Sequence, residues 1–172
     1  MAKTKNRNIR IIKNFNELEE EINFNEFDKK EHFIHICDLI PNKTLERLDM
    51  EIIDQEKCNI GGLVYIFVIN GKIFKIGQSI TNIKKRIQSY NCGKIEYRIS
   101  GTNSTTNYFV LQSLLSINQQ VNVYAFFPDL PEYEIFGKHY KDSWQVSKRA
   151  ENIIINEFIQ KYNKKPIGCT QR

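Results

Sequence analysis

The stretch LVYIFVINGKIFKIGQS, residues 63–79, has two runs of β-branched and aromatic residues on either side of Asn70-Gly71. An Asn-Gly pair between two such runs is the strongest short-range signal for a β-hairpin. The hairpin also carries Tyr65 and Lys75 among its Val, Ile and Phe residues. Burying a lysine in a sheet costs free energy unless the ammonium group has a partner or a task. These two residues therefore mark a candidate functional site.

The length of the hairpin loop decides whether Tyr65 and Lys75 share a face of the sheet. A two-residue loop at Asn70-Gly71 would place them on opposite faces. A three-residue loop over residues 69–71, with Gly71 left-handed, places Tyr65 directly opposite Lys75. We predict the three-residue loop because it also brings five apolar residues together on one core face. These are Val64, Ile66, Val68, Phe74 and Ile76.

Length and composition point to one globular domain, since the chain has 172 residues of which 41% are hydrophobic. No apolar run approaches the roughly eighteen residues of a membrane span, and Met1 is followed by AKTKNRNIRIIKN, which does not resemble a signal sequence. We therefore expect a cytoplasmic protein. The four cysteines stand far apart without a C-x-x-C pair, so we expect free thiols.

Charge is unevenly distributed along the chain, whose net charge is +5. Residues 1–15 have five basic and no acidic side chains, residues 16–57 have five basic and thirteen acidic ones, and residues 58–172 have fifteen basic and seven acidic ones. Basic segments of this kind suit a polyanion such as nucleic acid. The alternative is that these lysines and arginines only keep the protein soluble.

Hydrophobic periodicity predicts an α+β protein with helices first and then a β-β-α-β-α-β order. We expect a basic arm and helical segment over residues 1–60 and a core over 61–172. The helical segment includes apolar residues at helical spacing between 15 and 39 and a second amphipathic helix over 42–56. The core has expected helices at 82–91, which Thr81 would cap, at 104–118 and at 147–163, strands at 95–100 and 121–128, and a β-ribbon at 133–143.

Four short motifs together resemble the GIY-YIG nuclease family. They are GLVYIFV at 62–68, FKIGQS at 74–79, KKRIQSY at 84–90 and RAENIII at 149–155. The chain departs from the family pattern where Leu63-Val64-Tyr65 replaces Gly-Ile-Tyr and where Lys75 replaces a tyrosine. The resemblance is closest to the small homodimeric type II restriction endonucleases of this family, which share the N-terminal segment and the tail KKPIGCTQ at 164–171. It implies a small central mixed or antiparallel sheet flanked by helices, with an N-terminal helical extension and a β-ribbon insertion.

Phosphodiester hydrolysis needs a base for water, positive charge around phosphorus and stabilisation of the departing oxygen. Tyr65 is the candidate base, and because a free phenol titrates near pH ~10 it needs a cation nearby, a role that suits Lys75. Arg86 and Tyr90 are four residues apart on one expected helix, so they can hold the same phosphate group. Glu151 is the candidate ligand of one Mg²⁺, whose other ligands would be waters and phosphate oxygens.

Candidate DNA contacts are spread along the chain. The arm could follow phosphates, the ribbon is thin enough for the major groove, and the polar tail could reach base edges or simply fray. Two further candidates are Ser79, at the end of the hairpin, and Lys85, which follows it in the sequence. The candidates in the arm, the ribbon and the tail are Lys3, Lys5, Arg7, Lys138, His139, Lys141, Gln171 and Arg172.

The resemblance thus implies a bacterial Mg²⁺-dependent deoxyribonuclease that cleaves double-stranded DNA at a short palindromic site, including an interrupted site of the TCNGA type. It also implies a homodimer and a cognate DNA methyltransferase as functional partner. In such a protein residues 1–60 would make dimer or DNA contacts, and residues 61–172 would form the catalytic core. A palindromic site suits a two-fold enzyme. The alternative is an inactive or structure-specific GIY-YIG protein that binds or repairs DNA.

Overall fold

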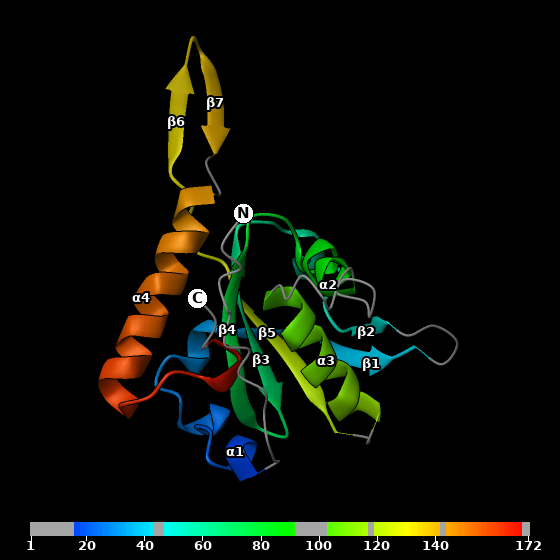
Figure 1. Cartoon of the computed structure of the whole chain (residues 1–172). Coiled ribbons are helices and arrows are strands. Elements are labelled where there is room, and N and C mark those ends of the chain that lie inside the picture. The colour runs from blue at the N-terminus through cyan, green and yellow to red at the C-terminus, as the bar shows by residue number, and fades with distance from the viewer. Residues whose placement is uncertain (1–15, 43–46, 92–102, 117–118, 142–143, 170–172) are drawn as a thin grey trace, which may run out of the picture.

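The computed structural model describes residues 16–42, 47–91, 103–116, 119–141 and 144–169. A five-stranded antiparallel sheet in the order β2-β1-β5-β3-β4 forms its centre, and helices cover both faces (Figure 1). The strands are β1 (Ile34–Pro41), β2 (Leu48–Ile52), β3 (Leu63–Ile69), β4 (Lys72–Ser79) and β5 (Val121–Phe126), with β6 (Glu132–Ile135) and β7 (Lys138–Lys141) in a separate ribbon. The helices are α1 (Asn16–Glu19), α2 (Ile83–Asn91), α3 (Asn103–Ser116) and α4 (Trp144–Tyr162).

The β3–β4 hairpin is present, but its loop is shorter than predicted. Asn70 and Gly71 both have positive φ, 48° and 79°, and Ile69 pairs with Lys72. This is the two-residue turn that Asn-Gly favours, because asparagine and glycine tolerate the left-handed region best. The prediction of a three-residue loop is therefore wrong.

A β-bulge in β4 brings Lys75 to the face that carries Tyr65. Val68 pairs with Ile73 and Phe67 pairs with Lys75, so Phe74 is the extra residue. Inserting one residue reverses the alternation of the strand beyond it. Lys75 consequently lies across from Phe67, while Tyr65 lies across from Gly77 and not from Lys75 as predicted. Phe74 joins the core cluster of Tyr65 and Phe67, which also corrects its predicted place beside Val64 and Ile66.

The predicted N-terminal helices are largely wrong, since residues 34–41 and 48–52 are strands. β1 pairs with both β2 and β5, so strands on both sides of residue 60 belong to one sheet. A register shift between His35 and Cys37 leaves Ile36 and Leu39 buried three residues apart. A bulged strand can thereby imitate the spacing of a helix.

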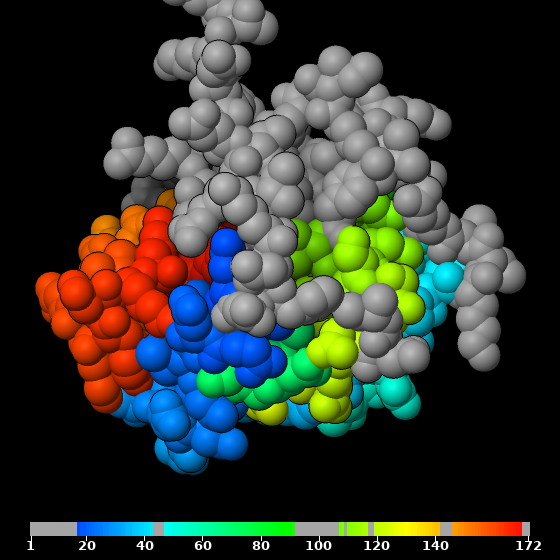
Figure 2. Space-filling view, turned by 60° about the horizontal axis from the view of Figure 1, so that its bottom comes forward, coloured from blue at the N-terminus to red at the C-terminus, as the bar shows by residue number. Residues whose placement is uncertain are grey.

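Each face of the sheet has its own apolar core. α2 and α3 cover one face, where Ile87 and Leu111 pack with Tyr65. α4 and the segment before β1 cover the other, where the rings of Phe158 and Phe27 pack at a tilt with centroids 5.8 Å apart. Figure 2 shows this N-terminal segment, in blue, against the orange-to-red end of α4, where salt bridges join the two.

The later elements agree with the sequence analysis. α2, α3, β5, α4 and the ribbon occur where the patterns predict them, although Asn82 rather than Thr81 caps α2 through its side-chain oxygen and the Lys85 amide (3.0 Å). The ribbon projects beyond the first turn of α4 (Figure 1). The strand expected at 95–100 lies outside the described residues. Within the described part of the chain, no helix has the length and apolar character needed to cross a membrane.

Candidate active site

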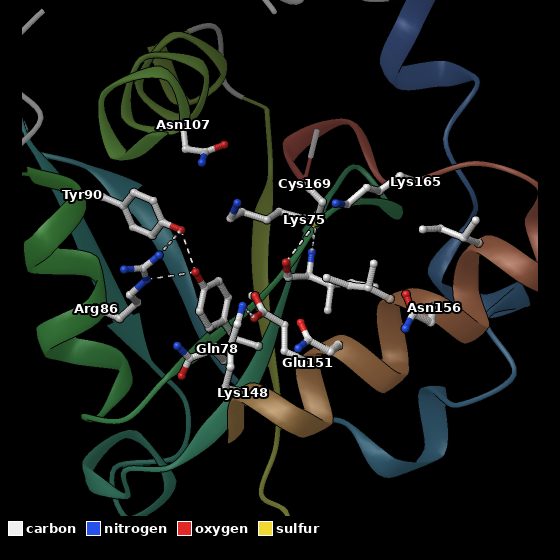
Figure 3. A pocket seen from close by; sticks show the side chains of 16 residues that line it. Lys75, Gln78, Arg86, Tyr90, Asn107, Lys148, Glu151, Asn156, Lys165 and Cys169 are labelled. Carbon is white, nitrogen blue, oxygen red and sulfur yellow. Dashed lines mark hydrogen bonds and ion pairs between the residues drawn. The ribbon is translucent and has the colours of Figure 1, made fainter. Parts of the chain in front are cut away.

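A cavity of about 500 Å³ opens between β4, α2 and α4 and contains all five candidate catalytic side chains (Figure 3). Tyr65 and Lys75 come from the hairpin, Arg86 and Tyr90 from α2, and Glu151 from α4. The further lining residues are Ile76, Gly77, Gln78, Asn107, Lys148, Asn152, Ile155, Asn156, Ile159, Lys165 and Cys169. The fold thus brings together candidate catalytic residues that lie up to 86 positions apart, from Tyr65 to Glu151.

Tyr65, Arg86 and Tyr90 form a hydrogen-bonded triad at one end of the cavity. The two phenol oxygens are 2.6 Å apart, and Arg86 donates from Nε to the Tyr65 oxygen (3.0 Å) and from a terminal nitrogen to the Tyr90 oxygen (3.3 Å). The guanidinium also lies over the Tyr90 ring, 4.8 Å from its centroid. Helical spacing places Arg86 and Tyr90 on one face of α2, four residues apart.

Electrostatics within the triad keep Tyr90 protonated and Arg86 charged. Burial, together with the neighbouring Tyr65 oxygen, raises the pKa of Tyr90 well above its ordinary value, and this outweighs the lowering by Arg86. Tyr90 therefore keeps its proton, and either hydroxyl can donate in the short bond between the two tyrosines. Burial lowers the pKa of Arg86, but the two phenol oxygens more than compensate, so the pKa is raised and the guanidinium stays charged. The Tyr65 oxygen thus accepts a hydrogen bond from a cation, Arg86.

Gly77 makes room for the Tyr65 ring. A Cβ built on Gly77 would lie 2.5 Å from both Cζ and the hydroxyl oxygen of Tyr65, far inside van der Waals contact. Only glycine lets the phenol lie over β4 at this position. The position of the Tyr65 phenol therefore requires the glycine of the KIG motif at 75–77.

Lys75 is nearly buried, with 9% of its surface exposed, and it lines the same cavity. Its Nζ donates to the carbonyl oxygen of Gly168 at 2.7 Å. The cation in hydrogen-bond contact with the Tyr65 oxygen is Arg86, through a bond that sequence spacing alone does not predict. Lys75 and Tyr65 share a face of the hairpin as diagonal neighbours.

Glu151 faces the cavity from α4 and forms an ion pair with Lys148 at 2.6 Å. The Glu151 side chain is 13% exposed, whereas that of Lys148 is 56% exposed, so the lysine can move away into solvent. The described residues contain no cluster of three or more His, Cys, Asp or Glu side chains arranged for a metal. One carboxylate with neighbouring amide oxygens fits Mg²⁺, a hard cation that keeps waters and takes substrate phosphate oxygens as ligands.

The candidate DNA-contact residues fall into three groups. Ser79 is buried and its hydroxyl is 3.2 Å from that of Thr81, whereas Lys85 is exposed on α2. Lys138, His139 and Lys141 are exposed on β7, and Lys141 pairs with Glu132 across the ribbon at 2.6 Å. Lys3, Lys5, Arg7, Gln171 and Arg172 lie outside the described residues.

Several residues of the cavity were not identified from the sequence. Gln78 accepts a hydrogen bond from the buried Ser147 hydroxyl (3.1 Å), which ties β4 to α4 next to the glycine under the Tyr65 ring. Asn107 is buried on α3, and Lys165 and Cys169 enter from the C-terminal segment. Only Lys148 had a local signal, because it precedes Glu151 by three residues and so shares its helix face.

Two solved structures of other proteins are similar to this chain. The structure of restriction endonuclease HPY188I in complex with product DNA is 59% identical in sequence, with a TM-score of 0.68, over 100% of this chain and 98% of that chain. The structure of a mutant of bacteriophage T4 EndoII is 19% identical, with a TM-score of 0.54, over 83% of this chain and 96% of that one, a likeness in fold. No protein-family model and no curated protein sequence matches. At 59% identity over its whole length, the chain belongs to the restriction endonuclease family of HPY188I.

Proposed function

We propose that the protein is a type II restriction endonuclease that hydrolyses phosphodiester bonds of double-stranded DNA at a short palindromic site. The observation that carries this proposal is the full-length likeness, at 59% identity, to a restriction endonuclease whose structure contains product DNA. The cavity adds support, because it brings a phenol, a guanidinium and a carboxylate together as phosphodiester hydrolysis requires. We also propose that the site is of the GIY-YIG type, on the motifs that place these residues.

In this mechanism Tyr65 takes a proton from the attacking water. For this transfer Tyr65 has to start as a phenolate, which Arg86 stabilises from 3.0 Å and to which Tyr90 donates a hydrogen bond, and it becomes a neutral phenol once it has the proton. Arg86 also lines the cavity, where the remaining donors of its planar guanidinium can hold phosphate oxygens. Lys75 lines the same cavity and adds positive charge for the phosphate group.

Glu151 would hold one Mg²⁺ per active site, with Lys148 released from its ion pair when the metal and DNA arrive. The ion, when bound, stabilises charge on the phosphate and on the departing oxygen. Since a single carboxylate gives weak affinity by itself, most of the binding would depend on DNA phosphates. Such a site needs no cluster of acidic residues in the protein.

For specificity we propose a homodimer on a two-fold DNA site, including an interrupted site of the TCNGA type, with a methyltransferase protecting the host sequence. The ribbon β6–β7 is the described element best shaped for a groove, because it projects from the body and has Lys138 and His139 exposed. The basic N-terminal arm and the C-terminal tail are the other candidates.

The direct test is digestion of a plasmid that contains many different short palindromes, with Mg²⁺ at moderate salt and with EDTA as control. We expect discrete fragments with Mg²⁺ and none with EDTA. A continuous smear would indicate a non-specific nuclease. Intact plasmid at every ionic strength, with DNA still retained in a gel-shift assay, would favour an inactive DNA-binding protein.

A further inference from the structure

The C-terminal turn at residues 166–169 packs onto β4 beside the cavity. β4 is the edge strand of the described sheet: residues 22–24 bridge its beginning, and its outer backbone groups further along have no neighbouring strand among the described residues. The Cys169 thiol fills this gap, since its sulfur accepts from the Ile76 amide and donates to the Ile76 carbonyl, both at 3.0 Å. Burial raises the pKa of Cys169, which keeps the thiol protonated for its donor role.

The same turn holds the end of Lys75. The Gly168 carbonyl accepts from Lys75 Nζ at 2.7 Å, and a Cβ on Gly168 would lie 2.9 Å from the Lys75 Cβ and from two atoms of Phe74. The turn therefore touches this lysine at both ends of its side chain. A lysine has four rotatable side-chain bonds, and such contacts restrict it to few conformations.

We propose that this turn is a positioning element for Lys75 and that Cys169 locks it onto β4, an inference that rests on the proposed nuclease function. A carbonyl acceptor suits the task, because it orients the ammonium group without neutralising it as a carboxylate would. The full positive charge then remains available to the phosphate. Lys75 is an inward-pointing side chain whose position depends on a segment 93 residues away in the sequence.

The test compares Cys169→Ala and Cys169→Ser with Cys58→Ala. Cys58 is a matched control, since it is also a fully buried thiol that donates to a backbone carbonyl (Ile36, 3.3 Å) but does not line the cavity. We expect Cys169→Ala to slow single-turnover cleavage about 10- to 100-fold without weakening DNA binding, as a displaced catalytic group does. Cys169→Ser, which keeps a donor and an acceptor, should recover most of the rate, and Cys58→Ala should cleave like the wild type.

Two further measurements separate positioning from general destabilisation. In a Lys75→Met background, Cys169→Ala should slow cleavage no further, because the residue that it positions is gone. Without DNA, trace acetylation followed by mass spectrometry should show Lys75 more reactive in Cys169→Ala than in the wild type, while other lysines keep their reactivity.

These measurements distinguish a failure of the positioning role from a failure of the proposed nuclease function. If the wild type does not cleave DNA but acetylation of Lys75 rises in Cys169→Ala, the nuclease proposal fails and the positioning contact stands. If the wild type cleaves and Lys75 acetylation is unchanged in Cys169→Ala, or if Cys169→Ala slows the enzyme no more than Cys58→Ala does, the positioning role is overturned.

Discussion

Arg86 and Tyr90, the hydrogen-bond partners of Tyr65, lie more than twenty residues away from it in the sequence. The i, i+4 spacing of Arg86 and Tyr90 is visible in the sequence, and so is their common helix face. Both side chains reach the Tyr65 oxygen because α2 packs on the sheet, and this packing is a tertiary contact that the spacing does not predict. For this reason the sequence pointed to Lys75 as the cation next to the phenol, whereas the structure shows Arg86 in hydrogen-bond contact with it.

Glu151 provides a test at the same scale. Glu151→Ala should reduce cleavage by at least about 100-fold while DNA binding changes little, because affinity comes mostly from Lys and Arg contacts to phosphates. The measurement is single-turnover cleavage together with a binding isotherm in Ca²⁺ or EDTA. Glu157→Ala, on the same helix but paired with Lys29 at 2.6 Å, is the matched control and should cleave normally. Wild-type rates in Glu151→Ala would refute the metal assignment.

At the scale of elements, β-bulges explain the errors of sequence reading. The hairpin could be recognised from Asn70-Gly71, but the extra residue at Phe74 could not, and it decides the face on which Lys75 lies. The bulge in β1 lets both Ile36 and Leu39 be buried although they are three residues apart, a spacing that predicts a helix. Because a bulge depends on pairing with a partner strand, no local sequence pattern predicts it.

The ribbon gives the prediction for this scale. Lys138→Ala should weaken DNA binding and reduce the slope of log K against log salt by about 1 if this lysine contacts one phosphate. Titrations of a labelled duplex at several salt concentrations measure both quantities. Lys29→Ala removes the same charge from the segment before β1, where Lys29 is paired with Glu157, and should leave the slope unchanged. Equal slopes for all three proteins would exclude the ribbon lysine from the interface.

For the whole molecule, the α+β class, the order of the described elements from residue 61 onward and the presence of the five candidate catalytic residues in the cavity were predictable, because each rests on a local pattern. The inclusion of residues 34–52 in the sheet was not, since it depends on pairing of β1 with β5 across some 85 residues, as in Asp38 with Asn122. The contribution of the C-terminal turn to the cavity depends on equally distant contacts.

Assembly on DNA is the prediction for the whole molecule. A palindromic site requires two copies that present the same elements to both half-sites. Sedimentation with a duplex carrying the mapped cleavage site, in Ca²⁺ to prevent cutting, should therefore show two chains per duplex. One chain per duplex at saturating protein would instead indicate a nicking or structure-specific enzyme.

The most direct test of the account is single-turnover cleavage by Tyr65→Phe, which removes the proposed base and keeps the ring that packs over Gly77. We expect the rate to fall at least about 100-fold at every pH, with DNA binding retained. Tyr162→Phe removes a hydroxyl that donates to the Glu26 carbonyl (3.0 Å) away from the cavity, and it should cleave at the wild-type rate. Cleavage by Tyr65→Phe at the rate of Tyr162→Phe would contradict the claim that this cavity is the catalytic centre with Tyr65 as its base.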